Sequence, residues 1–352
     1  MNRRCWVRWR DSFSDNWKSK IEKRPRRLKW VGFFAIVVAL TVCGARADAQ
    51  QPTKILRIGF LDASTATGMA SLLEAFRKEL SKLGWIEGKN LTIEYRSGPE
   101  RLPELAVDLV RLKVDLIVAA GLTAALAAKK ATSTIPIVMT NVGAPVAAGL
   151  VASLARPGGN VTGFDSLNFE LNTKRLEILK DAVPKLARVG LLRLPTGTLL
   201  IDLQMKELRP AAFALKLQLE EIETQSDAKG LESAFQTAEQ KRVQAIMTVA
   251  TRGFSGARKR VVELANKYRF PAIYYYKEFV DEGGLMFYGT DSTDIYRSAA
   301  GYVDKILKGA KPADLPVQQA TKFEFVINLK AAKQIDLTIP NRVLERSTHV
   351  IR

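Results

Sequence analysis

Residues 114–119 read Val114-Asp115-Leu116-Ile117-Val118-Ala119, an almost uninterrupted apolar run. A short strand that is apolar on both faces is typical of a parallel sheet covered by helices on each side. This run therefore predicts an α/β fold in which strands and helices alternate along the chain.

The sequence on either side of this run continues the alternation. Further strands are expected at 55–61, 91–95, 135–140 and 160–164. Helices are expected at 68–83, near 102–112 and at 123–131. Residues 145–155 follow a strand, so the alternation places a helix there as well. The helix at 68–83 is the clearest, because its apolar residues recur at helical spacing. After residue 165 the rhythm restarts, with a helix at 169–182 and strands at 187–192, 217–222, 245–249, 272–275 and 285–288.

About ten strands over 300 residues divide more naturally into two sheets than into one. We therefore predict two Rossmann-like lobes with parallel sheets. The Gly-rich loop Pro157-Gly158-Gly159-Asn160 is a natural boundary between them. A TIM barrel also alternates strands and helices, but it normally presents catalytic polar residues at its strand ends, and the sequence offers no convincing set.

The first 49 residues have the layout of a secretory signal peptide. They carry 12 Lys/Arg against 4 Asp/Glu, and residues 30–45 are free of charge. Two small-residue patterns follow, Ala45-Arg46-Ala47 and Ala47-Asp48-Ala49. This order predicts export and cleavage after Ala47 or Ala49. An uncleaved signal anchor is the alternative, although the apolar run is shorter than a comfortable bilayer span.

Composition excludes several kinds of chemistry. The chain has 352 residues, a formal charge of +18 and two cysteines, Cys5 and Cys43, both before the expected cleavage point. The single histidine is His349, near the C-terminus. A Ser-His-Asp triad, a disulfide and a Cys- or His-based metal site are therefore not expected, and no cofactor is predicted. The basic residues beyond the leader are scattered, so no nucleic-acid partner is expected either.

Ligands of open parallel sheets bind beyond the carboxyl ends of the strands. This rule selects loops rich in hydroxyls and glycine, which suit a small polar solute. The candidate ligand-binding residues are Asp62, Ser64, Thr65, Gly121, Leu122, Thr123, Asn141, Asp165, Thr251, Arg252, Tyr275 and Asp291. Asp62 or Asp291 would hold an ammonium group if the solute is an amino acid.

A purely structural interpretation applies to each of these residues taken singly. Ser, Thr and Asp at the start of a helix usually cap it. The case for a site rests on several loops converging. Tyr275 is also open to a core interpretation, because alternation turns it away from its two tyrosine neighbours.

Several longer runs resemble one family, the periplasmic ABC-transporter substrate-binding proteins of the type I two-lobed class. The branch that is most similar includes the tryptophan- and tyrosine-uptake binding proteins. The runs that carry the resemblance span 83–91, 147–163, 174–180, 278–286, 302–310 and 321–330, and include the segment Ala155-Arg156-Pro157-Gly158-Gly159-Asn160-Val161-Thr162-Gly163. Together they cover essentially everything after the leader.

The resemblance implies a type I periplasmic binding fold with hinge crossovers near 164, 289 and 320. It implies one lobe of 54–164 plus 290–320 and a second of 165–289 plus 321–352. Two positions depart from the pattern of the family. Ala144 stands where an Asp is usual, and Arg193-Leu194-Pro195 replaces a more polar loop. Both departures lie in loops expected to line the ligand site.

The resulting hypothesis is a monomeric periplasmic binding protein, not an enzyme, that captures a small-molecule solute for an ABC permease in the inner membrane. A receptor subunit of a signalling system is an alternative that shares the same lobes. A ligand-sensing transcription factor would need a DNA-binding motif that residues 1–49 do not supply. An exported enzyme would need a carboxylate pair, but no spacing singles out Asp62, Asp165 or Glu278.

Overall fold

The computed structural model describes residues 55–64, 66–98, 101–195 and 198–352. Residues 54–352 form one compact unit that contains two β-sheets. The predicted signal peptide lies outside the described residues. Among the helices of the described ranges, none is both long and apolar enough to cross a bilayer.

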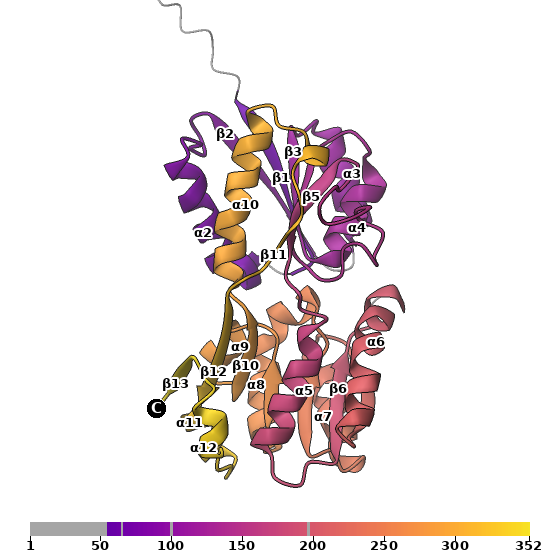
Figure 1. The fold of residues 1–352 in the computed structure, drawn as a ribbon, viewed down its shortest axis with the longest axis vertical. Coiled ribbons are helices and arrows are strands. Elements are labelled where there is room, and N and C mark those ends of the chain that lie inside the picture. Colours follow the sequence, from indigo (N-terminus) through magenta and orange to yellow (C-terminus); the bar gives the residue numbers. More distant parts are fainter. Residues whose placement is uncertain (1–54, 65, 99–100, 196–197) are drawn as a thin grey trace, which may run out of the picture. The chain divides into compact units, whose positions relative to one another are not determined.

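The first sheet is entirely parallel and has the strand order β11-β5-β4-β3-β1-β2. Helices α2 (Ala66–Lys82) and α10 (Ser292–Leu307) pack together on one face, and α3 (Leu102–Arg111) and α4 (Leu122–Ala131) pack together on the other (Figure 1). The strands are β1 (Leu56–Asp62), β2 (Leu91–Ser97), β3 (Leu116–Ala120), β4 (Ile137–Val142), β5 (Val161–Asp165) and β11 (Gln318–Gln319). The run that predicted the fold forms β3, and all five of its side chains are buried.

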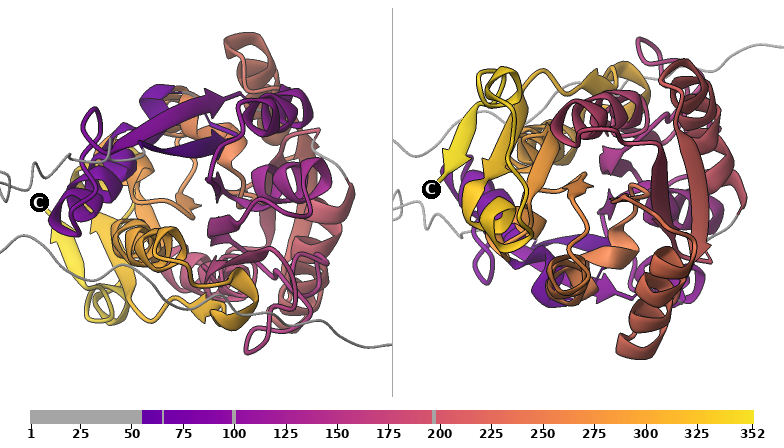
Figure 2. Two further views of the ribbon diagram at one scale, coloured as in Figure 1. Left: turned by 90° about the horizontal axis from the view of Figure 1, so that it is seen from above. Right: turned by 90° about the horizontal axis from the view of Figure 1, so that it is seen from below.

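The second sheet has the order β13-β12-β10-β9-β8-β6-β7. Its strands are β6 (Arg188–Arg193), β7 (Gln218–Glu223), β8 (Ala245–Thr248), β9 (Ala272–Tyr274), β10 (Met286–Thr290), β12 (Phe323–Asn328) and β13 (His349–Ile351). Its long helices are α5 (Leu171–Ala182), α6 (Thr198–Ala214), α7 (Ala228–Gln240) and α8 (Arg258–Lys267), and its short ones are η2 (Arg252–Ala257), α9 (Glu278–Asp281), α11 (Leu329–Gln334) and α12 (Asn341–Leu344). The C-terminus lies at the edge of this sheet, beyond β12 (Figures 1 and 2).

The chain passes between the two sheets three times. It leaves the first sheet after β5, returns from β10 to α10, and leaves again from β11 to β12. The η3 turn (Pro312–Asp314) precedes β11. Two α/β sheets joined by such crossovers make the type I periplasmic binding architecture, as predicted. The residue limits proposed for the two lobes stay a prediction.

Two details differ from the expected alternation. Residues 145–155 form turns and bends instead of a helix, because Gly149 has a φ of 70° and ends the single turn that follows Pro145. The second sheet is also not wholly parallel, since β12 pairs antiparallel with β10. The crossover from β11 to β12 enters the second sheet beside the end of β10, so β12 runs back along β10 in the opposite direction.

Candidate functional site

The loops that follow the carboxyl ends of strands in both sheets line a small cavity of about 20 Å³. This is roughly room for one water molecule. The loop after β3 and the end of β4 contribute from the first sheet, and the loop after β8 contributes from the second. The cavity is lined by Gly121, Leu122, Thr123, Asn141, Gly143, Asn168, Phe169, Leu200, Ala250, Thr251, Arg252 and Tyr276.

A buried ion pair joins the two sheets beside this cavity. Arg252 donates from Nε to Oδ1 of Asp62 at 3.1 Å and from Nη2 to Oδ2 at 2.7 Å. Asp62 is fully buried and Arg252 is 3% exposed. Arg252 also donates to Ser64 Oγ at 3.2 Å, and the Ser64 amide donates to Asp62 Oδ1 at 2.8 Å. Such two-pronged geometry fixes direction as well as distance, so the pair sets how the loop after β8 meets the end of β1.

The surroundings of Arg252 favour its charged form. Burial acts to lower the pKa of the guanidinium, but the attraction of Asp62 outweighs it and holds that pKa well above the usual value. The guanidinium carbon also lies 5.4 Å from the centre of the Tyr276 ring. A Cβ at Gly121 would approach the Cγ of Arg252 to 2.8 Å. Glycine at 121 therefore gives the arginine its path to Asp62.

Asn141 presents an amide to the cavity without any internal partner. The pairing of β4 with β5 shifts register between Met139 and Val142, and Asn141 lies inside this irregularity with a φ of 51°. A bulge of this kind re-aims a side chain, and Asn tolerates the left-handed conformation better than most residues. The side chain is buried, yet neither its Oδ1 nor its Nδ2 has a hydrogen-bond partner among the described residues.

A buried polar network supports the cavity from the side of the second sheet. Arg175, on α5, is fully buried and donates to Asn168 Oδ1, Asn172 Oδ1 and two backbone oxygens at 2.7–2.8 Å. Asn172 donates to Gln204 at 3.1 Å, and Gln204 in turn bonds the backbone of Ala250. The network thus holds two parts of the cavity lining, Asn168 and Ala250.

The structure gathers most of the predicted site residues in this one place. Gly121, Leu122, Thr123, Asn141, Thr251 and Arg252 line the cavity, and Asp62 and Ser64 bind Arg252. Tyr275 lies behind the lining, where its hydroxyl donates to the backbone oxygen of Thr251. Thr251 also accepts from the Gly253 amide at 3.3 Å, so it is a cap as well as a lining residue. Thr65 lies outside the described residues.

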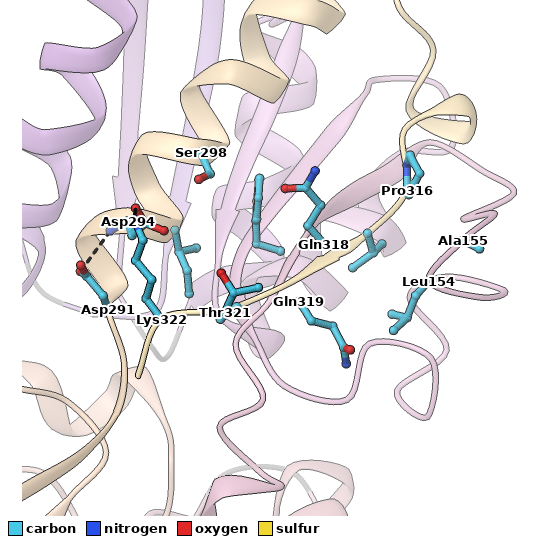
Figure 3. A pocket seen from close by; sticks show the side chains of 14 residues that line it. Leu154, Ala155, Asp291, Asp294, Ser298, Pro316, Gln318, Gln319, Thr321 and Lys322 are labelled. Atoms are coloured by element: carbon cyan, nitrogen blue, oxygen red, sulfur yellow. Dashed lines mark hydrogen bonds and ion pairs between the residues drawn. The ribbon is translucent and has the colours of Figure 1, made fainter. Parts of the chain in front are cut away.

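Two predicted residues lie elsewhere, at the crossovers. Asp291 caps α10 by accepting from the Asp294 amide at 3.1 Å, and it lines a groove of about 500 Å³ beside β11 (Figure 3). Asp165 accepts from the Leu167 amide at 2.9 Å and from Gln319 Nε2 at 3.1 Å. Neither carboxylate lines the cavity, so any role they have in solute binding would be exerted through the hinge.

Sequence reasoning missed several contributors. Tyr276, not Tyr275, lines the cavity, and Asn168 and Phe169 come from the crossover after β5. The network residues Asn172, Arg175 and Gln204 were also missed, although all three are fully buried. A signal was present on α5, because Asn172 and Arg175 continue at helical spacing the stripe that Leu176 and Leu179 form. Polar residues on a buried stripe indicate a buried network.

In the described part of the chain, no group of three or more His, Cys, Asp or Glu side chains is placed to hold a metal ion. The cavity lining likewise contains no carboxylate and no thiol. The prediction that the protein needs no cofactor stays a prediction.

Comparison with known proteins finds one matching family and several similar proteins. The sequence pattern of the ABC transporter substrate binding protein family matches residues 64–351. A tyrosine-binding protein of Clostridioides difficile is 29% identical over 270 residues, covering 75% of this chain and 76% of the relative. A conserved domain protein from Vibrio cholerae superposes with a TM-score of 0.77 at 29% identity, covering 84% of this chain and all of that one. An ABC domain from Streptococcus pneumoniae in complex with L-Trp gives a TM-score of 0.73 at 25% identity, with the same coverage.

Proposed function

This chain belongs to the ABC transporter substrate-binding protein family, and we propose that it captures a small polar or amino-acid-like solute between its two sheets. The cavity there has room for about one water molecule, so the sheets must move apart to admit the solute. The solute would be passed to the permease of an ABC importer. The family is defined by binding and not by catalysis, and we assign no reaction to this chain.

One observation carries the proposal: Asn141 presents a buried amide with no internal partner to a cavity lined from both sheets. An unsatisfied buried amide costs free energy, so a solute that supplies its missing hydrogen bonds would be bound more tightly. The relatives named for tyrosine and L-Trp support a solute with an amino-acid-like polar end. Phe169 and Tyr276 would supply apolar contact for the remainder of the solute.

We further propose that the protein acts outside the inner membrane as a monomer. The basic, apolar and small-residue segments of residues 1–49 support export, and the family is generally extracytoplasmic. N-terminal sequencing of protein from the periplasmic fraction should begin at Asp48 or Gln50. Recovery of intact chain from membranes alone would contradict this part of the proposal.

A thermal-shift screen tests the binding function directly. The panel contains amino acids, small carboxylates and sugars. A ligand at 100 times its Kd stabilises the native state by about 2.7 kcal/mol. For a protein of this size the melting temperature should rise by roughly 2–4 °C for each kcal/mol.

The Asn141→Ala variant should lose most of this shift, whereas Asn341→Ala, on the exposed start of α12, should keep it. A shift of equal size in wild type and Asn141→Ala would show that the solute binds elsewhere.

A further inference from the structure

The side chain of Arg252 reaches from the second sheet to the first and is held there as a bound ligand would be. Its Nε and Nη2 donate to Oδ1 and Oδ2 of Asp62 at 3.1 and 2.7 Å, and Nη2 also donates to Ser64 Oγ at 3.2 Å. Its guanidinium carbon lies 5.4 Å from the centre of the Tyr276 ring. A carboxylate, a hydroxyl and an aromatic ring are groups that recognise a planar organic cation.

These groups come from the positions where open α/β sheets bind ligands, beyond the carboxyl ends of their strands. Asp62 is the last residue of β1, and Ser64 follows it. Tyr276 follows β9, and the stem of Arg252 passes Gly121, which follows β3. The surroundings of the guanidinium therefore form a subsite for a cation, and the chain fills it with one of its own side chains.

With Arg252 in place, the cavity offers no anion to a solute. Both oxygens of Asp62 accept hydrogen bonds from Arg252, and the Ser64 amide adds another to Oδ1 at 2.8 Å. The described residues that line the cavity include Arg252 but no Asp or Glu. A solute ammonium group would lose its hydration there and would meet a like charge without a counterion. Both effects oppose the binding of a cation.

We infer that Arg252 is a specificity-determining residue that acts as an internal ligand: its guanidinium fills the subsite beside Asp62 and keeps the cationic group of a solute out of it. As a statement about solute choice, this inference rests on the proposed function. Removal of the Arg252 side chain leaves Asp62 as an unpaired carboxylate beside an enlarged cavity. The emptied subsite should then take a small guanidinium cation from solution.

Chemical rescue of Arg252→Ala tests the inference. The probe is methylguanidinium chloride, compared with KCl at equal ionic strength, and melting is followed by circular dichroism. Without the probe the variant should melt below wild type, because Asp62 keeps its charge and loses its partner. For a Kd of about 1 mM, a probe concentration of about 20 mM should raise the melting temperature of the variant by at least about 3 °C. Wild type, whose subsite is filled, should change by less than about 1 °C.

Matched comparisons locate the bound probe. Arg258→Ala removes a partly buried ion pair with Glu282, neither member of which lines the cavity, and should show no rescue. The double variant that combines Asp62→Asn with Arg252→Ala has the same space but no carboxylate, so it should show none either. Tetramethylammonium chloride carries the charge without an N–H donor and should raise the melting temperature of Arg252→Ala less than methylguanidinium does.

The same measurement decides the case in which Arg252→Ala does not fold alone, because methylguanidinium but not KCl should then restore its helical signal. An Arg252→Ala chain, folded or unfolded, that responds to methylguanidinium no more than to KCl would overturn the inference. Equal rescue of the double variant or of wild type would overturn it too. The thermal-shift screen of wild type tests the proposed function without any Arg252 variant. A failed screen would remove solute selection and leave the cation subsite, whereas a failed rescue would remove the subsite and leave the proposed function.

Discussion

Asp62, the last residue of β1, and Arg252 are 190 residues apart, yet they form the most deeply buried ion pair among the described residues. Asp62 is held on the first sheet by the Ser64 amide, and Arg252 starts η2 on the second. A charge of this kind is costly when its partner is removed, by about 3–5 kcal/mol if it stays buried. Separation of the two segments would let water solvate the unpaired group. The cost of removing one partner therefore depends on how far apart the two sheets are.

Replacing Asp62 with Asn should therefore favour a more open molecule. The variant leaves Arg252 charged and unpaired, and opening the cavity is the least costly way to hydrate it. Small-angle scattering of solute-free protein in 0.15 M salt, roughly the physiological ionic strength, should give a larger radius of gyration for Asp62→Asn than for wild type. Glu94→Gln, which removes a half-exposed pair with Arg57, is the matched control. Superimposable scattering curves for Asp62→Asn and wild type would contradict this account of the pair.

Asp165 provides a test through pH. Burial raises the pKa of this carboxyl above its usual range, and the hydrogen bonds from Leu167 and Gln319 oppose the rise only in part. The folded chain thus binds this proton more tightly than the unfolded chain does. The free energy of unfolding consequently falls as pH rises from the usual value, about 3.9, through the raised folded value.

Asp165→Asn should remove this penalty. The variant should melt at the same temperature as wild type near pH 4 and at a higher temperature at pH 7, as followed by circular dichroism. The exposed Asp202→Asn variant should show no such pH dependence. A difference between Asp165→Asn and wild type that is the same at both pH values would refute the assignment.

At the scale of single elements, a helix or strand was predictable from the sequence wherever one residue pattern was much stronger than the others. The strands were predictable because parallel strands need apolar runs, and β3 is the clearest case. The helix expected at 145–155 was wrong because Gly149 takes the left-handed conformation and ends the turn that its apolar residues begin. Tyr276 lines the cavity where Tyr275 was expected, and the reason is again local. Strand β9 ends at Tyr274, so strand alternation no longer governs the next two side chains.

The candidate loops were predictable for a general reason, since the carboxyl ends of parallel strands gather at one edge of a sheet. The partners of their side chains were not. The Asp62–Arg252 pair and the contact of Arg175 with Asn168 depend on how loops from distant segments meet. The orientation of the Asn141 side chain depends on a β-bulge that no residue pattern predicts. Periodicity identifies elements, whereas these contacts are set by three-dimensional packing.

At the scale of the whole molecule, two α/β sheets joined by three crossovers bring polar loops from both sides to one small cavity. The membership of the family and the unpartnered Asn141 support the same proposed function. The central claim is that a single small solute binds there, and that it completes hydrogen bonds which the chain itself leaves unmade.

Native mass spectrometry of the freshly purified chain, saturated with a periplasmic extract and then desalted, tests this claim most directly. Wild type should carry one small molecule per chain, and Asn141→Ala should carry less than about a tenth as much, since the loss of the hydrogen bonds to Asn141 lowers affinity by roughly 10-fold or more and the weaker complex dissociates during desalting. Asn341→Ala should match wild type. A wild-type chain that stays at its bare mass, or an Asn141→Ala chain loaded to the wild-type level, would contradict the account.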